Sequence, residues 1–109
     1  LGSLYEIQIE EVNKKQIRKA AEAFFDREQV LFEIKRPGGT RTVDLREFVQ
    51  SITMSENGAD NGITTFFMRI GHDNGRTVRP QRVVESFSEF GLAICVQELI
   101  VDRLKLYFE

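Results

Sequence analysis

The clearest pattern of apolar and polar positions in the chain begins at Val30. Apolar side chains occupy alternate positions at Val30, Phe32 and Ile34, and a period of two places them on one face of a strand. A proline and two glycines at 37–39 end this strand, because proline lacks an amide hydrogen and glycine accepts positive φ. β-branched residues resume over 40–45, so the pattern predicts a β-hairpin.

A helical period precedes the hairpin, over residues 14 to about 27. Its apolar positions recur three and four residues apart, at Ile17, Ala20, Ala21, Phe24 and Phe25. That spacing is typical of one face of a helix that packs on a sheet. Asn13 is a suitable N-cap for this helix, because its side chain can accept a hydrogen bond from a free amide of the first turn.

Alternation predicts three further strands, at 5–10, 63–70 and 99–108. The buried face expected for the last of them consists of Ile100, Leu104, Leu106 and Phe108. A second helix is expected to begin at Pro80 and to end before Gly91, because proline suits the first helical position and glycine suits the C-cap.

The segment between the hairpin and the strand at 63–70 allows two interpretations. Residues 44–47 (DLRE) resemble a capping signal, which predicts a turn or a bulge. A strand after this turn would place Phe48, Gln50, Ile52 and Met54 on one side and would turn Val49 away. A short helical turn through Phe48 is the alternative. Residues 56–62 and 71–75 have the composition of loops.

The order of these elements predicts the α+β class. We expect a ferredoxin-like βαββαβ frame with one added strand, in which the hairpin supplies strands two and three. Both helices would cover one face of an antiparallel sheet, and the other face would be open. A single α+β domain is expected over residues 1–109. Because the chain begins at Leu1 rather than at methionine, we interpret it as a fragment of a longer protein.

Composition limits the classes of function. The formal net charge is −2, which argues against a dedicated nucleic-acid-binding protein, although local basic patches remain compatible with it. The single cysteine, Cys95, allows no internal disulfide, so a reducing compartment, the cytoplasm, is expected. The longest apolar runs are far shorter than the ~18 residues that span a bilayer, so no membrane association is expected.

Positive side chains gather at the tip of the predicted hairpin. Lys35, Arg36 and Arg41 flank its turn. We favour a structural interpretation, because lysine and arginine near a hairpin end keep a strand edge soluble and unpaired. The alternative is a contact with an anionic ligand.

A second set of charged residues lies within or beside apolar segments: Asp44, Arg46, Arg79 and Arg103. We favour a structural network of ion pairs, because pairing is how such charges are tolerated. The alternative is a surface for phosphate or carboxylate, since arginine presents a planar fork of donors. Arg76, Arg79 and Arg82 also surround the start of the second predicted helix, where free amides and the helix dipole favour anions.

The sequence contains no recognisable catalytic arrangement. The single histidine, His72, lacks the cluster of cysteines or carboxylates that a metal site needs. The serines at 51, 55, 86 and 88 have no histidine partner in a known spacing. We therefore expect no metal and no cofactor in this chain, and we favour a non-catalytic role for the chain alone; an independent enzyme of unknown type is the last of the alternatives.

Three short segments carry a resemblance to a known family. Val43-Asp44-Leu45-Arg46 follows the basic hairpin, Thr77-Val78-Arg79-Pro80 precedes a helix with Val83 and Val84, and the closing strand holds Arg103. This arrangement resembles the bacterial radical-SAM-linked protein family, a domain of unknown function found alone or at the C-terminus of radical SAM proteins. The resemblance runs over most of the chain and corresponds to the C-terminal half of the family domain.

The resemblance implies an accessory role. Radical SAM enzymes hold an iron–sulfur cluster with three closely spaced cysteines, whereas this chain has one cysteine. It implies a non-catalytic accessory or substrate-binding domain, whose open sheet face contacts a radical SAM protein or the missing N-terminal half, or self-associates. The alternative is an RNA-binding module of an RNA-modification system, which would use Lys35, Arg36, Arg41, Arg76, Arg79 and Arg82.

Overall fold

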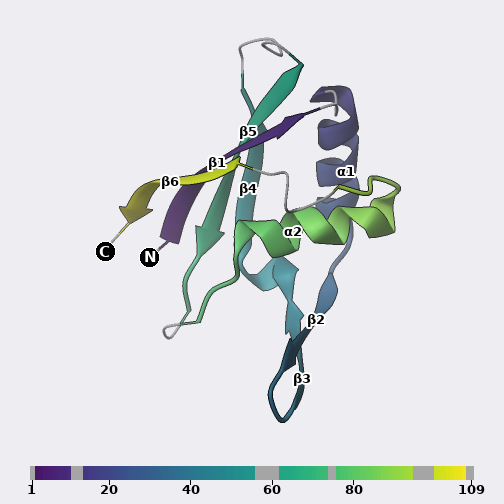
Figure 1. Ribbon diagram of the computed structural model, residues 1–109, viewed down its shortest axis with the longest axis vertical. Coiled ribbons are helices and arrows are strands. Elements are labelled where there is room, and N and C mark those ends of the chain that lie inside the picture. Colours follow the sequence, from purple (N-terminus) through teal and green to yellow (C-terminus); the bar gives the residue numbers. More distant parts are fainter. Residues whose placement is uncertain (1, 11–13, 56–61, 74–75, 95–99, 108–109) are drawn as a thin grey trace.

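A four-stranded antiparallel sheet, a separate two-stranded sheet and two helices make up the computed structural model of the protein (Figure 1). The structure describes residues 2–10, 14–55, 62–73, 76–94 and 100–107. The predicted α+β class is confirmed. In the described residues, no helix is long and apolar enough to cross a membrane.

The larger sheet has the strand order β4-β5-β1-β6. It contains β1 (Gly2–Glu10), β4 (Val49–Met54), β5 (Ile63–Gly71) and β6 (Ile100–Tyr107). β1 runs antiparallel to both β5 and β6, and β4 runs antiparallel to β5. The connections from β1 to β4 and from β5 to β6 therefore each join parallel strands and pass over the strand between them. The ferredoxin-like description stays a prediction.

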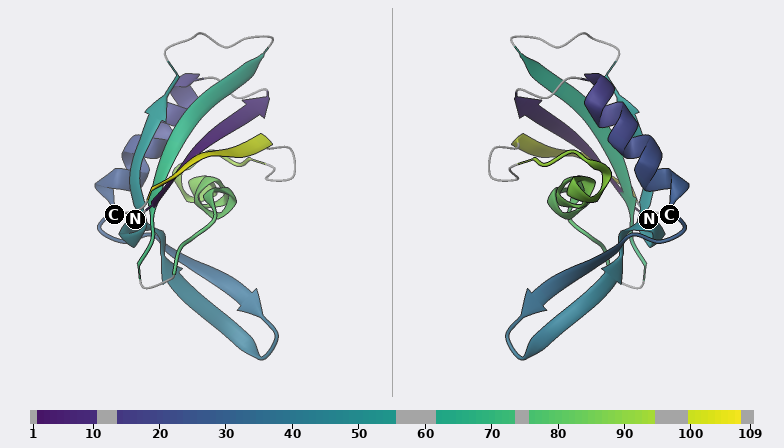
Figure 2. Two further views of the ribbon diagram at one scale, coloured as in Figure 1. Left: turned by 90° about the vertical axis from the view of Figure 1, so that its left-hand side faces the viewer. Right: turned by 90° about the vertical axis from the view of Figure 1, so that its right-hand side faces the viewer.

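Both helices lie on the same face of this sheet (Figure 2). α1 (Lys14–Asp26) follows β1, and α2 (Pro80–Ser86) continues into a 3-10 turn, η2 (Phe87–Phe90). Gly91 ends this segment with a φ of 87°, a left-handed conformation that glycine adopts without steric cost. The expected starts of both helices are confirmed, whereas the proposed N-cap Asn13 lies outside the described residues.

Phenylalanines fill the space between the helices and the sheet. Phe24, Phe66 and Phe87 are fully buried. The Phe24 ring meets Phe25 edge-on at a centroid distance of 5.2 Å and Phe87 at 6.3 Å, the arrangement that the aromatic quadrupole favours. Phe66 lies opposite Ile7 in the β1–β5 register, so the inward faces of the two central strands complete the core.

The hairpin forms as predicted, from β2 (Leu31–Arg36) and β3 (Gly39–Asp44), but it makes a sheet of its own. The expectation that it supplies strands two and three of the main sheet was wrong, because β4 and β5 take those places. Val30 and Val43 are buried at the base of the hairpin, whereas Phe32 and Ile34 are only half-buried. The hairpin therefore packs at its base and projects from the body (Figures 1 and 2).

The turn predicted at 44–47 exists as the 3-10 turn η1 (Leu45–Glu47), and the strand β4 follows it. The prediction of which β4 side chains face the core was partly wrong. Its register with β5 shifts between Val49 and Ser51, and such a bulge turns the following side chains to the other face. Val49 is consequently buried and Gln50 exposed, whereas Ile52 and Met54 face inward as expected.

The predicted buried face of β6 was also partly wrong. Ile100 is 54% exposed, and Val101 packs against the core instead. The register between β6 and β1 shifts opposite Leu4 and Tyr5, so a strict period of two does not hold along the strand. Cys95, residues 56–61 and the side chains of 104–108 lie outside the described part of the chain.

Truncation of Phe24 tests this account of the core. We expect Phe24→Ala to lower the free energy of unfolding by about 3–5 kcal/mol, as for other fully buried phenylalanines. Phe67→Ala is the matched control, because Phe67 is half-buried on the helix-free face of the same sheet. Urea denaturation monitored by circular dichroism measures the free energy of unfolding of both variants. Equal losses for the two variants would contradict the core described above.

Candidate functional site

Asp44 lies where the hairpin returns to the body of the protein. Its Oδ1 atom accepts hydrogen bonds from the backbone amides of Val30 and Arg46, each at 3.0 Å. The amide of Leu45 donates to the carbonyl oxygen of Val30 at 2.9 Å. Asp44 is thus the N-cap of η1 and closes the base of the hairpin, which is a structural role.

Arg46 joins the same corner to the end of α1. Its Nε donates to the carbonyl oxygen of Arg27 at 2.9 Å. Its guanidinium lies 4.9 Å from the ring centroid of Phe25 and 6.0 Å from that of Phe24, within the range of cation–π attraction. Asp44 and Arg46 thus make structural contacts through backbone hydrogen bonds and aromatic rings, and not through the expected ion pairs.

The arginines at the start of α2 are mostly neutralised. Arg76 forms an exposed ion pair with Asp73 at 3.3 Å, and Arg82 forms one with Glu85 at 3.1 Å. The guanidinium of Arg82 also lies 6.0 Å from the ring of Phe32 on the hairpin. Arg79 is exposed and precedes Pro80 without a side-chain cap. The expected anion site at this helix start thus has two of its three charges already paired.

The basic residues at the tip of the hairpin, unlike Arg76 and Arg82, have no acidic partner in the described residues. Lys35 and Arg36 are exposed, Arg41 is half-exposed, and within the described part of the chain none of them forms an ion pair. Arg41 lies opposite Ile34, and Arg36 lies opposite Gly39. Cross-strand partners share a face, so Arg36 and Arg41 are neighbours on one face of the hairpin, and Lys35 lies on the other. This tip is the candidate anion-binding site.

Arg103 does not join these groups. It is exposed on β6, at the opposite edge of the main sheet from β4, and it pairs in register with Tyr5. The structure thus separates the residues singled out in the sequence into the hairpin tip, the Asp44 corner, the start of α2 and the β6 edge.

One polar pair escaped sequence reasoning. The Ser3 hydroxyl and the Nε2 atom of His72 lie 3.2 Å apart in hydrogen-bond contact. The two residues meet because β1 and β5 pair from Gly2 opposite Gly71 onward, a register that no local pattern reveals. Ser3 is fully buried, and its contact with His72 joins the N-terminal end of β1 to the residue that follows β5. Among the described residues, no group of three metal-ligating side chains occurs.

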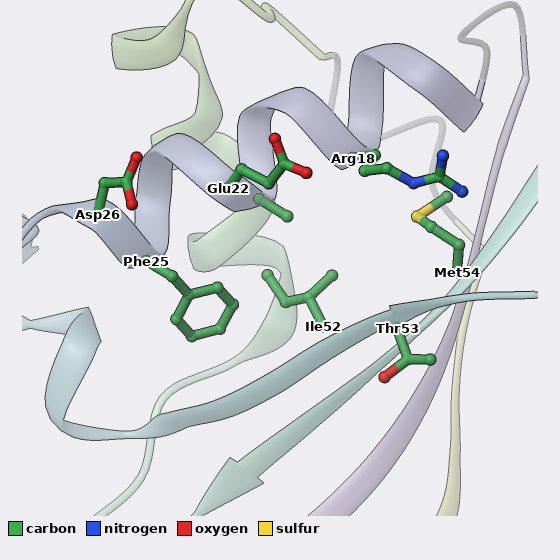
Figure 3. Close-up of a pocket in the computed structure, with 8 residues that line it drawn as sticks. Arg18, Glu22, Phe25, Asp26, Ile52, Thr53 and Met54 are labelled. Carbon is green, nitrogen blue, oxygen red and sulfur yellow. The ribbon is translucent and has the colours of Figure 1, made fainter.

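A groove between α1 and the edge strand β4 also escaped sequence reasoning (Figure 3). It has a volume of about 540 Å³, within the range of ligand-binding pockets. Its apolar lining consists of Ala21, Phe25, Ile52 and Met54, and its charged rim consists of Arg18, Glu22 and Asp26. The helical and strand periods together placed the apolar residues inward, but neither period reveals that the two elements leave a space between them.

Removal of the Asp44 carboxylate tests its structural role. We expect Asp44→Ala to lower the free energy of unfolding by about 1–3 kcal/mol, because two backbone amides lose their acceptor. Asp44→Asn should cost less, since its amide oxygen can still accept a hydrogen bond. Glu47→Ala, an exposed acid in the same turn, is the control in urea denaturation. An Asp44→Ala variant as stable as this control would refute the role.

Comparison with known proteins identifies one family. The model of a family described as an uncharacterized protein conserved in bacteria (DUF2344) matches residues 2–80. The matched range includes the hairpin, the Asp44 corner and the start of α2, whereas Val83, Val84 and Arg103 lie beyond it. No curated protein and no solved structure matches the chain.

Proposed function

This chain belongs to DUF2344, a family of uncharacterised proteins conserved in bacteria, and from that premise we propose that it is a non-catalytic accessory or substrate-binding domain that works beside a radical SAM enzyme. The family confirms the expected bacterial domain of unknown function. The radical SAM association is carried by the resemblance of the segments around Asp44 and Arg79. In this proposal the partner enzyme supplies the radical chemistry, and this chain supplies a binding surface.

The basic tip of the projecting hairpin is the observation that carries the proposal. Lys35, Arg36 and Arg41 concentrate positive charge there, although the whole chain has a net charge of −2. Like charges placed close together on a hairpin repel one another. A partner surface or substrate that carries negative charge would relieve this repulsion and would form charge-assisted hydrogen bonds with the guanidinium groups.

The root of the hairpin suits it to act as a binding arm. Hydrogen bonds to Asp44 fix its two ends, and Arg82 of α2 contacts Phe32 at mid-length. A tip held by a rigid base loses less conformational entropy on binding than a loose loop of the same charge. The arm could therefore present its cations to a partner at low entropic cost.

RNA is the second candidate for the anionic partner. Arg36 and Arg41 share one face of the hairpin, and guanidinium groups recognise phosphate oxygens through paired donors. The observation that favours RNA is the absence, in the described residues, of an acidic partner for these two arginines. Binding of this kind depends strongly on salt, because each phosphate contact releases counterions.

The first prediction concerns RNA. We expect total tRNA and ribosomal RNA fragments to bind the chain at low salt and to dissociate as salt rises. Arg36→Ala/Arg41→Ala should lower the slope of log K against log salt by about 1.4, which corresponds to two phosphate contacts on single-stranded RNA. Lys15→Ala/Lys19→Ala, two exposed cations on α1, is the control. Fluorescence anisotropy over a salt series measures the slopes. The absence of binding at low salt would eliminate the RNA role.

The second prediction concerns the enzyme. We expect the radical SAM protein encoded in the same genome to bind this chain, and the Arg36→Ala/Arg41→Ala variant to bind it more weakly. Two exposed charge pairs would give a loss of about fivefold in affinity. Isothermal titration with the purified proteins measures it, again with Lys15→Ala/Lys19→Ala as the control. If neither the wild-type chain nor the control binds, the accessory role is wrong.

A further inference from the structure

The strand β4 has a free hydrogen-bonding edge. In the described structure it pairs with β5 alone and lies at the end of the sheet. The amide of Ser55 donates to the carbonyl oxygen of Thr65 at 3.1 Å, and Thr53 pairs with Phe67 in the same register. Alternate residues of an antiparallel strand point their backbone groups toward the partner. The backbone N–H and C=O groups of Ile52 and Met54 therefore point away from β5, to the open side.

The same two residues supply side chains to the groove. Ile52 and Met54 line it from the strand, and Ala21 and Phe25 line it from α1 (Figure 3). An added strand at this edge would bond the backbone of Ile52 and Met54 and would turn alternate side chains into the groove. This combination of a free edge and a pocket for alternate side chains is the geometry of peptide recognition by strand addition.

The rim of the groove has a basic end and an acidic end. Arg18 lies beside Met54 at one end, Asp26 lies near Phe25 at the other end, and Glu22 lies between them, above Ile52 (Figure 3). All three charged side chains are exposed, and within the described residues none of them forms an ion pair. The rim charges are therefore available to a partner in the groove.

The two acids repel each other across one turn of α1. Glu22 and Asp26 are four residues apart on α1, and like charges at this spacing repel each other. Asp26 is also the last residue of α1, where the helix dipole disfavours negative charge. A positively charged partner residue at this end of the groove would reverse both effects.

We propose that the groove between α1 and β4 binds an extended peptide segment of another protein, which adds to β4 as an antiparallel strand. Its groove-facing positions carry, in order, an acidic residue, two apolar residues and a basic residue. The acidic residue meets Arg18, the apolar residues lie beside Met54 and Ile52, and the basic residue meets the two rim acids. β4 runs from the acidic end toward the basic end of the groove, so an antiparallel strand passes Arg18 first, and this sets the order of the charges along the peptide.

A second copy of this chain fits the groove less well. Its own edge strand β4 (Val49–Met54) contains no charged residue, so pairing of two β4 edges would offer the rim charges no matching charges from the added strand. A segment with alternating apolar residues between opposite charges satisfies both the edge and the rim. The proposed site is separate from the hairpin tip, so it does not depend on the function proposed above.

A designed heptapeptide, Glu-Thr-Val-Thr-Val-Thr-Lys, with a fluorescent label, is the probe. Its first, third, fifth and seventh side chains share one face of a strand. We expect it to bind the full chain in the micromolar range by fluorescence anisotropy. The peptide with its two charged ends exchanged should bind about fivefold more weakly, because both sets of rim charges would then be repelled.

Methylation of the peptide backbone tests the strand addition itself. A methyl group on the amide of the first valine removes a hydrogen bond to β4, and we expect a loss of about tenfold in affinity. The same methyl group on the central threonine is the matched control, because that amide points away from β4. The control peptide should bind like the parent.

Variants of the protein locate the site. Glu22→Gln/Asp26→Asn should weaken binding of the parent peptide about fivefold, while its melting temperature should be unchanged or higher, because a repulsive pair has been removed. Glu28→Gln, an exposed acid beyond α1, and Arg36→Ala/Arg41→Ala at the hairpin tip should both bind normally.

Three results would overturn the proposal. The first is the absence of binding at millimolar peptide. The second is binding that does not respond to charge exchange and to methylation. The third is a stable dimer of the chain, seen by analytical ultracentrifugation, that the peptide cannot dissociate, because a second copy would then occupy the edge. None of these results bears on the RNA or enzyme experiments, which test the hairpin tip.

Discussion

The hydrogen bonds to Asp44 hold together the part of the chain on which both proposed binding surfaces depend. A single carboxylate oxygen accepts from Val30, where the chain enters the hairpin, and from Arg46, where it leaves. Without this acceptor, two backbone amides at a partly buried corner would lose their partner. The corner sets the direction of the hairpin on one side and the start of β4 on the other, because η1 and Phe48 lead directly into that strand.

Local patterns predicted most elements because the energies that select them are local. The alternation at 30–34, the helical spacing from Ile17 to Phe25, and the glycine at position 91 each decide a conformation within a few residues. The bulge after Val49 and the register shift opposite Leu4 and Tyr5 depend on the partner strand. A sequence pattern contains no information about that partner strand. The prediction of which side chains of β4 and β6 face the core was therefore partly wrong.

The same distinction explains which parts of the candidate site could be predicted from the sequence. The charge cluster of Lys35, Arg36 and Arg41 was visible, because a tight turn brings together residues that are close in the chain. The aromatic rings that lie against Arg46 and Arg82 belong to Phe25 and Phe32, on elements distant in sequence. The groove beside β4 was invisible for a further reason, because an edge strand is defined by the neighbour that it lacks.

Charge is distributed over the two surfaces in opposite ways. The hairpin tip collects cations at the end of an arm, whereas the groove has acids at one end and an arginine at the other. Arg46 lies between the two surfaces, since it stacks on Phe25 in the groove lining and its own backbone amide bonds the hairpin corner. A substitution at Arg46 would therefore disturb both surfaces at once. Lys35 and Arg36 at the tip and the three charges on the groove rim are exposed and make no ion pairs in the described structure, so substitutions there can test one proposed surface at a time without loss of the fold.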